Sequence, residues 1–275
     1  MTTSASMTGI AILGVAGRMG RALVEAVQDS PDAELAGATV REGSQFLQAD
    51  VGAIAGVGST GIKAATTLDA GCDVIIDFTS VEALEANLEL ATRLARPIVI
   101  GTTGLSEAQK SLLSDTAREI PIVFAPNMSV GVNVLIDIVG RVASLLGDTY
   151  DVEIIETHHR FKKDAPSGTA LRLGEAAADA LGRSLSECAV YGREGHTGER
   201  TAREIGFETI RGGDVVGDHT VLFAGLGERV ELTHKASSRL TFATGAVKAA
   251  VWLAGKPPGL YDMRDVLGLS ADQNK

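Results

Sequence analysis

The chain has 275 residues, 45% of them hydrophobic but only 4% aromatic, and its formal net charge at pH 7 is −10. This length allows one large domain or two smaller ones, and the scarcity of aromatic side chains favours α/β layers over an all-β sandwich. The acidic balance, without any long basic run, excludes the usual kinds of nucleic-acid binding protein.

Two cysteines far apart in the sequence, Cys72 and Cys188, give no disulfide framework and fit a reducing compartment. The N-terminal MTTSASMTG has neither the charged nor the apolar region of a signal peptide. No apolar run is expected to reach the length of a membrane span. We therefore expect a cytoplasmic protein that binds neither membrane nor nucleic acid.

The first predicted element is a short strand, Ile10 to Leu13, that runs into the glycine turn Gly14-Val-Ala-Gly17-Arg-Met-Gly20. Apolar residues then recur at helical spacing from Met19 to Val27. In this arrangement glycines let the backbone approach a dinucleotide pyrophosphate, which lies at the helix N-terminus. The spacing is GxxGxxG rather than the common GxGxxG, so a turn without a ligand is the alternative.

The chain up to Phe124 then alternates predicted strands and helices, with Gly43 to Gly61 as a glycine-rich loop. Helices are predicted at Val81–Ala95 and after the capping residue Ser106, and strands at Glu34–Val40, Cys72–Phe78, Pro97–Ile100 and Pro121–Phe124. The last three strands end in small, polar loops, and in a doubly wound parallel sheet such ends line the cofactor crevice. Ordinary turns are the alternative explanation.

The second half changes character after Val130 to Leu146, which is apolar on most faces and predicts a buried helix. A strand is predicted at Asp151–Ile155 and a helix at Thr169–Leu181. Three strands then follow without helices between them, at Phe207–Ile210, His219–Ala224 and Arg229–Thr233. Such a succession predicts an antiparallel or mixed sheet, whose edges and free face suit self-association.

The predicted fold class is α/β. A Rossmann-type doubly wound parallel sheet comprises residues 1–129 and, through a returning helix at Arg239–Leu253, residues 239–275. A second α+β domain, residues 130–238, carries the mixed or antiparallel sheet. We assign substrate binding and oligomerisation to this second domain.

The loop ETHHRFKKDAPSGTA, Glu156 to Ala170, contains the highest concentration of potentially functional side chains in the sequence. His158 can transfer protons near neutral pH, and Lys162 supplies positive charge for a carboxylate or an electron-rich transition state. Ser167 is a good helix N-cap, which would leave the amides of Gly168, Thr169 and Ala170 as an anion site. A merely solvated loop is the alternative. A metal site would need further ligands at suitable spacing, so we predict none.

These motifs closely resemble those of the dihydrodipicolinate reductase family, from Ile10 to about Leu267. The likeness includes GVAGRMG, DFTS, GTTG, APNMSVGVN, the histidine loop and HKASSRLTFATGAVKAA. The resemblance implies reduction of 4-hydroxy-tetrahydrodipicolinate to tetrahydrodipicolinate with loss of water, in diaminopimelate and lysine biosynthesis. It implies NADPH or NADH as coenzyme, a small dicarboxylate as substrate, closure of the two domains on it, and a homotetramer through the second sheet.

Carried over by position, the family's proton donor/acceptor falls on His158 and its second proton donor on Lys162. Substrate contacts fall on His159, Gly168 and Thr169. Coenzyme contacts fall on Gly14, Val15, Ala16, Gly17, Arg18, Met19, Arg41, Gly101, Thr102, Thr103, Ala125, Pro126, Asn127 and Met128.

One departure from the family concerns the coenzyme. Where many members place an acidic residue at the end of the second strand, this chain has Val40 followed by Arg41, which favours NADPH. Two other functions stay open: a different Rossmann oxidoreductase, such as an amino-acid dehydrogenase, and a non-catalytic nucleotide sensor.

Overall fold

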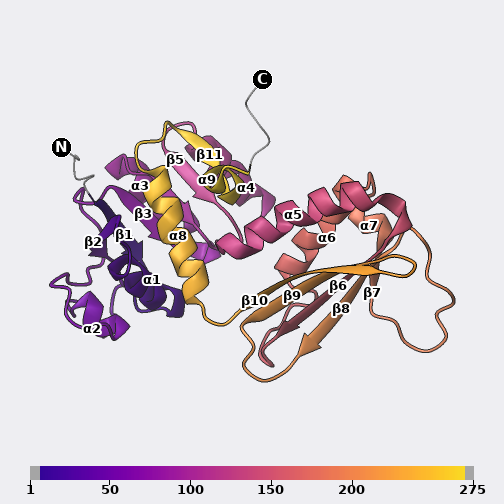
Figure 1. Cartoon of the computed structure of the whole chain (residues 1–275). Coiled ribbons are helices and arrows are strands. Elements are labelled where there is room, and N and C mark those ends of the chain that lie inside the picture. The colour runs from indigo at the N-terminus through magenta and orange to yellow at the C-terminus, as the bar shows by residue number, and fades with distance from the viewer. Residues whose placement is uncertain (1–6, 270–275) are drawn as a thin grey trace, which may run out of the picture. The chain divides into compact units, whose positions relative to one another are not determined.

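The computed structural model describes residues 7–269, which form two compact units (Figure 1). One unit contains the chain up to Val130 and from Arg239 onward, and the other contains Gly131–Ser238. Each unit is built around its own sheet. Residues 1–6, which carry most of the segment considered for a signal peptide, lie outside the described residues, as do residues 270–275.

The first unit contains a six-stranded sheet in the order β11-β5-β4-β3-β1-β2, and its strand pairs are parallel. Residues Ile10 and Ile12 pack on one face and Ile75 and Ile98 on the other, so both faces are buried. The strands are β1 (Thr8–Leu13), β2 (Ala33–Ala38), β3 (Val74–Asp77), β4 (Ile98–Ile100), β5 (Pro121–Phe124) and β11 (Gly259–Tyr261). The predicted doubly wound parallel sheet is confirmed.

Helices cover both faces of this sheet. Buried residues of α1 and α8 belong to one core cluster and those of α3 and α4 to the other. The helices are α1 (Arg18–Gln28), α2 (Val51–Ala55), η1 (Val81–Ala83), α3 (Leu84–Leu94), α4 (Glu107–Thr116), α8 (Leu240–Leu253) and α9 (Met263–Leu267). Ser106 caps α4, as predicted, in a reciprocal capping box with Gln109.

The prediction that residues 43–61 form only a loop was wrong, because α2 lies within them. Asp50 caps this helix by accepting from the Ala53 amide. A Cβ on Gly52 would come within 2.1 Å of the Gly58 carbonyl oxygen. The small residues that suggested a loop are therefore what allows this short helix to pack against the chain that follows it.

The second unit contains a five-stranded mixed sheet in the order β10-β9-β6-β8-β7. The β6–β8 and β7–β8 pairs are parallel, and the β6–β9 and β9–β10 pairs are antiparallel. The strands are β6 (Asp151–His158), β7 (Ala189–Tyr191), β8 (Ile205–Arg211), β9 (Gly217–Ala224) and β10 (Arg229–Ala236). This confirms the predicted mixed sheet. However, β6 extends beyond the predicted Ile155, and no strand was predicted at β7.

One face of this sheet packs against helices, as Figure 1 shows for α5 and α6. The helices of the unit are α5 (Val130–Leu146), whose first residue belongs to the other unit, η2 (Gly147–Thr149), α6 (Gly168–Ala180) and α7 (Leu185–Cys188). Residues Val139 and Ala143 of α5 join Ile154 and Phe223 of the sheet in one core.

Two expectations about α5 were wrong. Residues Val130–Thr149 form one 20-residue helical run of mean hydropathy 1.6, which by length and composition alone could cross a membrane. The helix is also not buried all round, since only 22% of that apolar window is buried and Leu145 is 84% exposed. Its buried residues recur every three or four positions because one stripe packs on the sheet.

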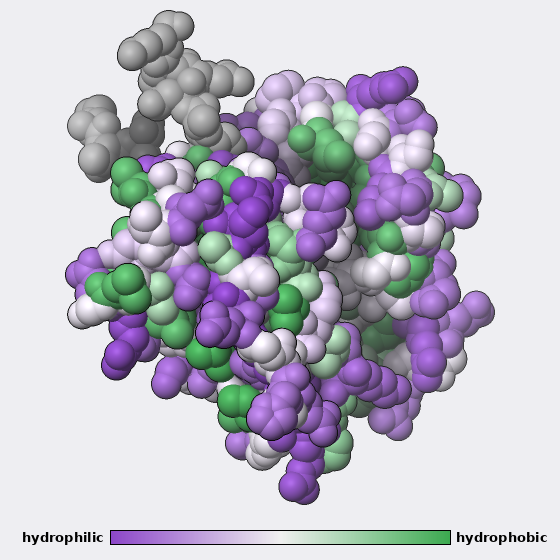
Figure 2. Space-filling view, turned by 90° about the vertical axis from the view of Figure 1, so that its right-hand side faces the viewer, coloured by the Kyte–Doolittle hydropathy of each residue, from purple (hydrophilic) through white to green (hydrophobic). Residues whose placement is uncertain are grey.

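On the face drawn in Figure 2, hydrophilic residues cover most of the area and hydrophobic ones occur in small groups.

Candidate functional site

The glycine turn of the first unit links the end of β1 to the start of α1. Gly14 has φ of 71°, and a Cβ there would lie 2.8 Å from Thr79 Cγ2. Gly17 is the N-cap of α1 and offers no side-chain hydrogen bond to the first turn. A Cβ on Gly20 would lie 2.5 Å from the Gly14 carbonyl oxygen, so the helix packs directly on the turn. The geometry fits a pyrophosphate bound by backbone amides.

The end of β2 is joined to this turn by hydrogen bonds. The Val15 amide donates to the Thr39 carbonyl at 2.9 Å, and the Gly14 amide donates to Thr39 Oγ1 at 3.3 Å. Val40 is buried, whereas Arg41 is exposed. Arg41 therefore follows directly on the segment bonded to the turn, where the adenosine ribose of a dinucleotide is expected.

The other predicted coenzyme residues follow β4 and β5, which are neighbours in the same parallel sheet. Gly101 has no room for a side chain, since a Cβ would lie 2.2 Å from the Phe78 ring. Thr102 Oγ1 is buried and has no hydrogen-bond partner among the described residues. The carboxyl ends of parallel strands lie at the same end of a sheet. The structure therefore brings three segments together there: Gly14–Met19, Gly101–Thr103 and Ala125–Met128. These groups fit a bound dinucleotide.

In the second unit, strand geometry places two functional side chains together. Glu156 and His158 are two residues apart on β6, so both face the same side of the sheet, and both are buried. Cross-strand register adds two more groups: His219 on β9 lies opposite Glu156, and Arg211 on β8 lies opposite His158.

Glu156 is the most heavily bonded of these groups. Arg211 donates Nη1 to Oε2 at 2.9 Å and Nη2 to Oε1 at 2.7 Å, and the Ser167 amide donates to Oε1 at 3.1 Å. Burial acts to raise the pKa of Glu156, but the bonds from Arg211 and His158 outweigh it and hold the pKa below its usual range. Glu156 is therefore ionised at neutral pH.

The imidazole of His158 is held between Glu156 and Gly217. Its Nδ1 is bonded to Glu156 Oε2, and a Cβ on Gly217 would lie 3.0 Å from its Nε2. Burial lowers the pKa of His158, and Lys162 and Arg211 add to that effect, while Glu156 opposes it. An ionised carboxylate only accepts hydrogen bonds, so the neutral ring carries its proton on Nδ1 and has a lone pair on Nε2.

The loop after His158 supplies the remaining predicted residues. Lys162 Nζ pairs with Asp164 Oδ2 at 2.8 Å, and its side chain is 21% exposed. His159 is less buried than His158, and its Nδ1 accepts from the Phe161 amide at 3.2 Å. The adjacent histidines thus have different environments, as expected for an extended chain.

The start of α6 differs from the prediction in one respect. Ser167 is the N-cap, as predicted, but its Oγ accepts from the Ala170 amide at 3.1 Å, so that amide is not available to a ligand. A Cβ on Gly168 would meet nothing within 4 Å, so open space adjoins the first helical residue. The candidate anion site is therefore smaller than predicted and centres on Gly168.

Three of these side chains resemble a metal site in outline. One potential ligand atom each from Glu156, His158 and His219 lies within 4.8 Å of the others. The oxygens of Glu156 are already bonded to Arg211, however, and a guanidinium at the site disfavours a divalent cation. The cluster is better suited to proton transfer.

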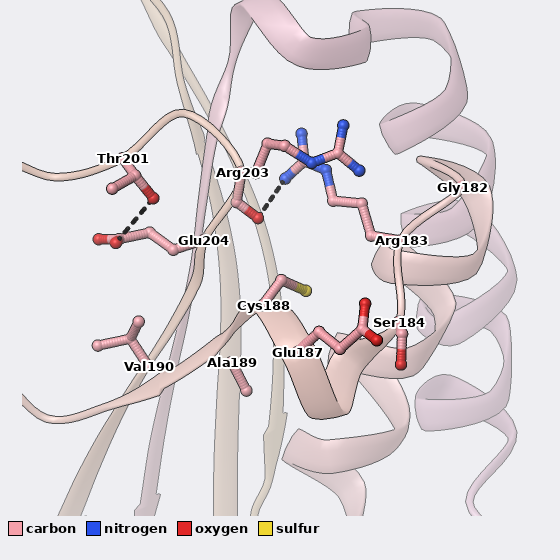
Figure 3. Close-up of a pocket in the computed structure, with 10 residues that line it drawn as sticks. All are labelled: Gly182, Arg183, Ser184, Glu187, Cys188, Ala189, Val190, Thr201, Arg203 and Glu204. Carbon is pink, nitrogen blue, oxygen red and sulfur yellow. Dashed lines mark hydrogen bonds between the residues drawn. The ribbon is translucent and has the colours of Figure 1, made fainter.

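A pocket of about 520 Å³ lies elsewhere in this unit, between α7, β7 and residues Thr201–Glu204 (Figure 3). None of the predicted site residues lines it. Its Arg183 is buried, pairs with Asp148, and donates to the Arg203 carbonyl at 3.1 Å. These bonds give the arginine a structural role.

Four groups of this site were not predicted from the sequence: Glu156, Arg211, Gly217 and His219. Glu156 was placed in the loop without a role, His219 was only the first residue of a predicted strand, and Arg211 and Gly217 were assigned to no site. The alternation of Glu156 and His158 was an available signal, because a strand through both puts them on one face. The sequence holds no comparable signal for Arg211 and His219, which depend on strand register.

Family comparisons cover nearly the whole described chain. The profile described as "Dihydrodipicolinate reductase, N-terminus" matches residues 8–128, and the profile described as "Dihydrodipicolinate reductase, C-terminus" matches residues 131–267.

Individual relatives agree with these matches. A 4-hydroxy-tetrahydrodipicolinate reductase from Hahella chejuensis (strain KCTC 2396) is 63% identical over 96% of this chain and 100% of its own. One from Pseudomonas fluorescens (strain SBW25) is 58% identical over the same shares. Among solved structures, a dipicolinate-bound dihydrodipicolinate reductase from Paenisporosarcina sp. TG-14 is 25% identical, with a TM-score of 0.71, covering 93% of this chain and 97% of its own.

Proposed function

The chain belongs to the dihydrodipicolinate reductase family, and we propose below which of its residues carry out the family's reaction. It catalyses the NAD(P)H-dependent reduction of 4-hydroxy-tetrahydrodipicolinate to tetrahydrodipicolinate, with loss of water. The reaction belongs to diaminopimelate and lysine biosynthesis. The coenzyme supplies a hydride to the unsaturated ring. We assign coenzyme binding to Gly14–Met19, Arg41, Gly101–Thr103 and Ala125–Met128.

The observation that carries the proposal is the buried pair of Glu156 and His158, with Nε2 of His158 next to a residue without a side chain. We assign proton exchange with the substrate to His158 Nε2 and a second proton donation to Lys162 Nζ. Lys162 also counters negative charge that develops on the ring.

We assign substrate binding to His159, Gly168 and Thr169. The start of α6 offers backbone amides at the positive end of the helix dipole, which suits a ring carboxylate. Open space next to Gly168 supports this assignment. The Paenisporosarcina protein was solved with dipicolinate, a planar dicarboxylate of the same class.

A coupled assay with freshly made 4-hydroxy-tetrahydrodipicolinate, followed by NAD(P)H absorbance, tests the function. We expect turnover with this substrate and none with amino acids, which excludes an amino-acid dehydrogenase. Binding of coenzyme without turnover of any substrate would instead support a nucleotide sensor.

For the residue roles, His158→Gln and Lys162→Ala should each lower kcat roughly a hundredfold or more with the fold intact. Near wild-type kcat in either would remove its role.

We propose that both coenzymes are accepted, with NADPH preferred. An acidic residue at the end of β2 would bind the ribose hydroxyls of NADH and repel a 2′-phosphate. Here Val40 removes that repulsion, and Arg41 offers a guanidinium that forms no ion pair with any described residue.

We further propose a cytoplasmic homotetramer that assembles through the second sheet. Helices α5 and α6 cover one face of that sheet. No helix among the described residues of this core packs on the opposite face. On that face, Ile210 of β8 is 50% exposed and Leu222 of β9 is half-buried. Apolar side chains on an open sheet suit burial against a second copy. The molecular mass in solution, measured by light scattering, tests the assembly.

A further inference from the structure

We propose that Glu156 is a positioning residue for proton transfer at His158. Held by the Arg211 guanidinium, its carboxylate fixes the imidazole with the proton on Nδ1 and leaves Nε2 to exchange a proton with the substrate. The inference rests on the proposed catalytic role of His158, and it adds a residue that itself touches neither substrate nor coenzyme.

The carboxylate of Glu156 is held in one orientation. Both of its oxygens accept from Arg211, at 2.9 and 2.7 Å, and Oε1 also accepts from the Ser167 amide at 3.1 Å. Its side chain is only 1% exposed, so water cannot replace these bonds. A bidentate guanidinium fixes the plane of the carboxylate, and thereby the direction from which it accepts the bond of His158.

Arg211 is itself fixed, and it is bonded to the loop that carries Lys162. Its Nη2 donates to the Asp164 carbonyl at 2.7 Å, and its Nη1 donates to the Ile210 carbonyl at 2.7 Å. The side chain of Asp164 in turn pairs with Lys162 at 2.8 Å. One guanidinium therefore orients both proposed proton-handling groups, His158 through Glu156 and Lys162 through Asp164.

Glu156 also sets the balance of charge around His158. The titratable and charged groups that face His158 are Glu156 on its own strand, Arg211 on β8, His219 on β9 and Lys162 in the loop. The pKa of His219 is lowered to about 4, mainly by burial, so His219 is neutral near pH 7. Glu156 is then the anion bonded to the ring, and it opposes two cations, of which Lys162 is also paired with Asp164. Without the charge of Glu156, the effect of Lys162 and Arg211, which lowers the pKa of His158, would be less opposed.

The test is Glu156→Gln in the full chain, with three readouts. The amide can bond Nδ1 as donor or acceptor, so ¹⁵N NMR of labelled histidine should change from an Nδ1–H ring to a mixture of tautomers. The limb of the pH–rate profile that reports the ionisation of His158 should move to lower pH. The value of kcat should fall about tenfold or more while KM changes little, because the substrate contacts remain.

Glu153→Gln is the matched control. Glu153 lies on the same strand and is also held by arginines, Arg193 and Arg200, but it does not contact His158. Its replacement should leave the tautomer and the pH limb of His158 unchanged. If Glu156→Gln does not fold because Arg211 is left unpaired, the double variant Glu156→Gln/Arg211→Gln removes that buried charge. It should show the same tautomer change, with a smaller shift of the pH limb because a cation that lowers the pKa of His158 is lost together with the anion.

An Nδ1–H ring and an unmoved pH limb in a folded Glu156 variant would overturn the inference. A loss of kcat without either change would also overturn it, because the role of Glu156 would then be only structural. The NMR readout needs no turnover, so it separates this inference from the catalytic role of His158. That role fails independently if His158→Gln remains active.

Discussion

Gly217 illustrates how a missing side chain can serve the proposed chemistry. A Cβ there would lie 3.0 Å from His158 Nε2 and 3.3 Å from Cδ2, which is closer than ordinary carbon contacts. We predict that Gly217→Ala lowers kcat/KM about ten- to a hundredfold, because the methyl group displaces or covers the reacting nitrogen. Steady-state kinetics with circular dichroism as a check on folding measures this.

Gly212→Ala is the control for that substitution. A Cβ on Gly212 would meet nothing within 4 Å, and its amide, which donates to the His158 carbonyl at 2.9 Å, would be retained. Neither glycine has the positive φ that only glycine adopts easily, so backbone strain does not separate the two variants. Equal kinetics in both variants would contradict the proposed access to Nε2.

Arg41 is the residue on which the proposed coenzyme preference depends. An exposed charge pair is weak, so we expect NADPH to be favoured by about 1–2 kcal/mol, or roughly five- to thirtyfold in kcat/KM. Arg41→Ala should weaken NADPH more than NADH, and more so at low salt. Glu42→Ala tests whether the neighbouring carboxylate binds the ribose instead. Equal losses for both coenzymes, or a wild-type preference for NADH, would disprove the assignment.

At the scale of elements, the start of α6 connects helix capping to substrate binding. Ser167 is extended, with ψ of 152°, which is compatible with a proline after it, and proline is well tolerated at the first helical position. Gly168→Pro should therefore leave the fold intact while removing one amide donor and filling the open space beside it. We predict a higher KM for the dicarboxylate and an unchanged KM for NADPH.

Glu107→Pro provides the comparison, because Glu107 occupies the same position after the N-cap Ser106 of α4. It should leave the KM for the dicarboxylate near the wild-type value. A rise in both KM values with Gly168→Pro, or no change in either, would contradict a carboxylate site at this helix.

The elements differ in how far the sequence could predict them. Strands β1, β3 and β5 were predictable because they are continuous apolar runs ending in glycine or polar turns, and α4 because Ser106 and Gln109 form a local capping box. The glycine turn and the histidine loop were predictable for the same reason, since their signals are local. By contrast, α2 was hidden by its glycines, which lower helix propensity but permit close packing.

The buried site depends on contacts between segments far apart in sequence. Arg211 is 55 positions from Glu156, and the hydrogen bond between Ser167 and His219 spans 52. Such contacts follow from the register of β6 with β8 and β9, and a shift of one residue would turn every side chain of a strand to the other face. Periodicity within one strand gives the face of His158 but not its partners.

At the scale of the whole molecule, the buried imidazole of His219 should make stability depend on pH. Burial, followed by the repulsion from His158, lowers its pKa from 6.5 to about 4, and the side chain is largely enclosed. The unfolded chain therefore binds more protons than the folded one between those two values. Stability is complete above the unfolded pKa and is lost as pH falls from 6.5 to about 4.

The shift from 6.5 to about 4 corresponds to a loss of roughly 3 kcal/mol in the free energy of unfolding. His219→Gln removes this proton linkage but also the ring that bonds Ser167, so the variant should be less stable at neutral pH and show a flatter profile below it. The lowered pKa values of His158 and His234 add a similar slope to both proteins, so the difference between the two curves isolates His219. Urea unfolding followed by circular dichroism across this range gives both curves. Parallel curves would mean that His219 titrates normally in the folded protein, and thus that water reaches the interior of the site.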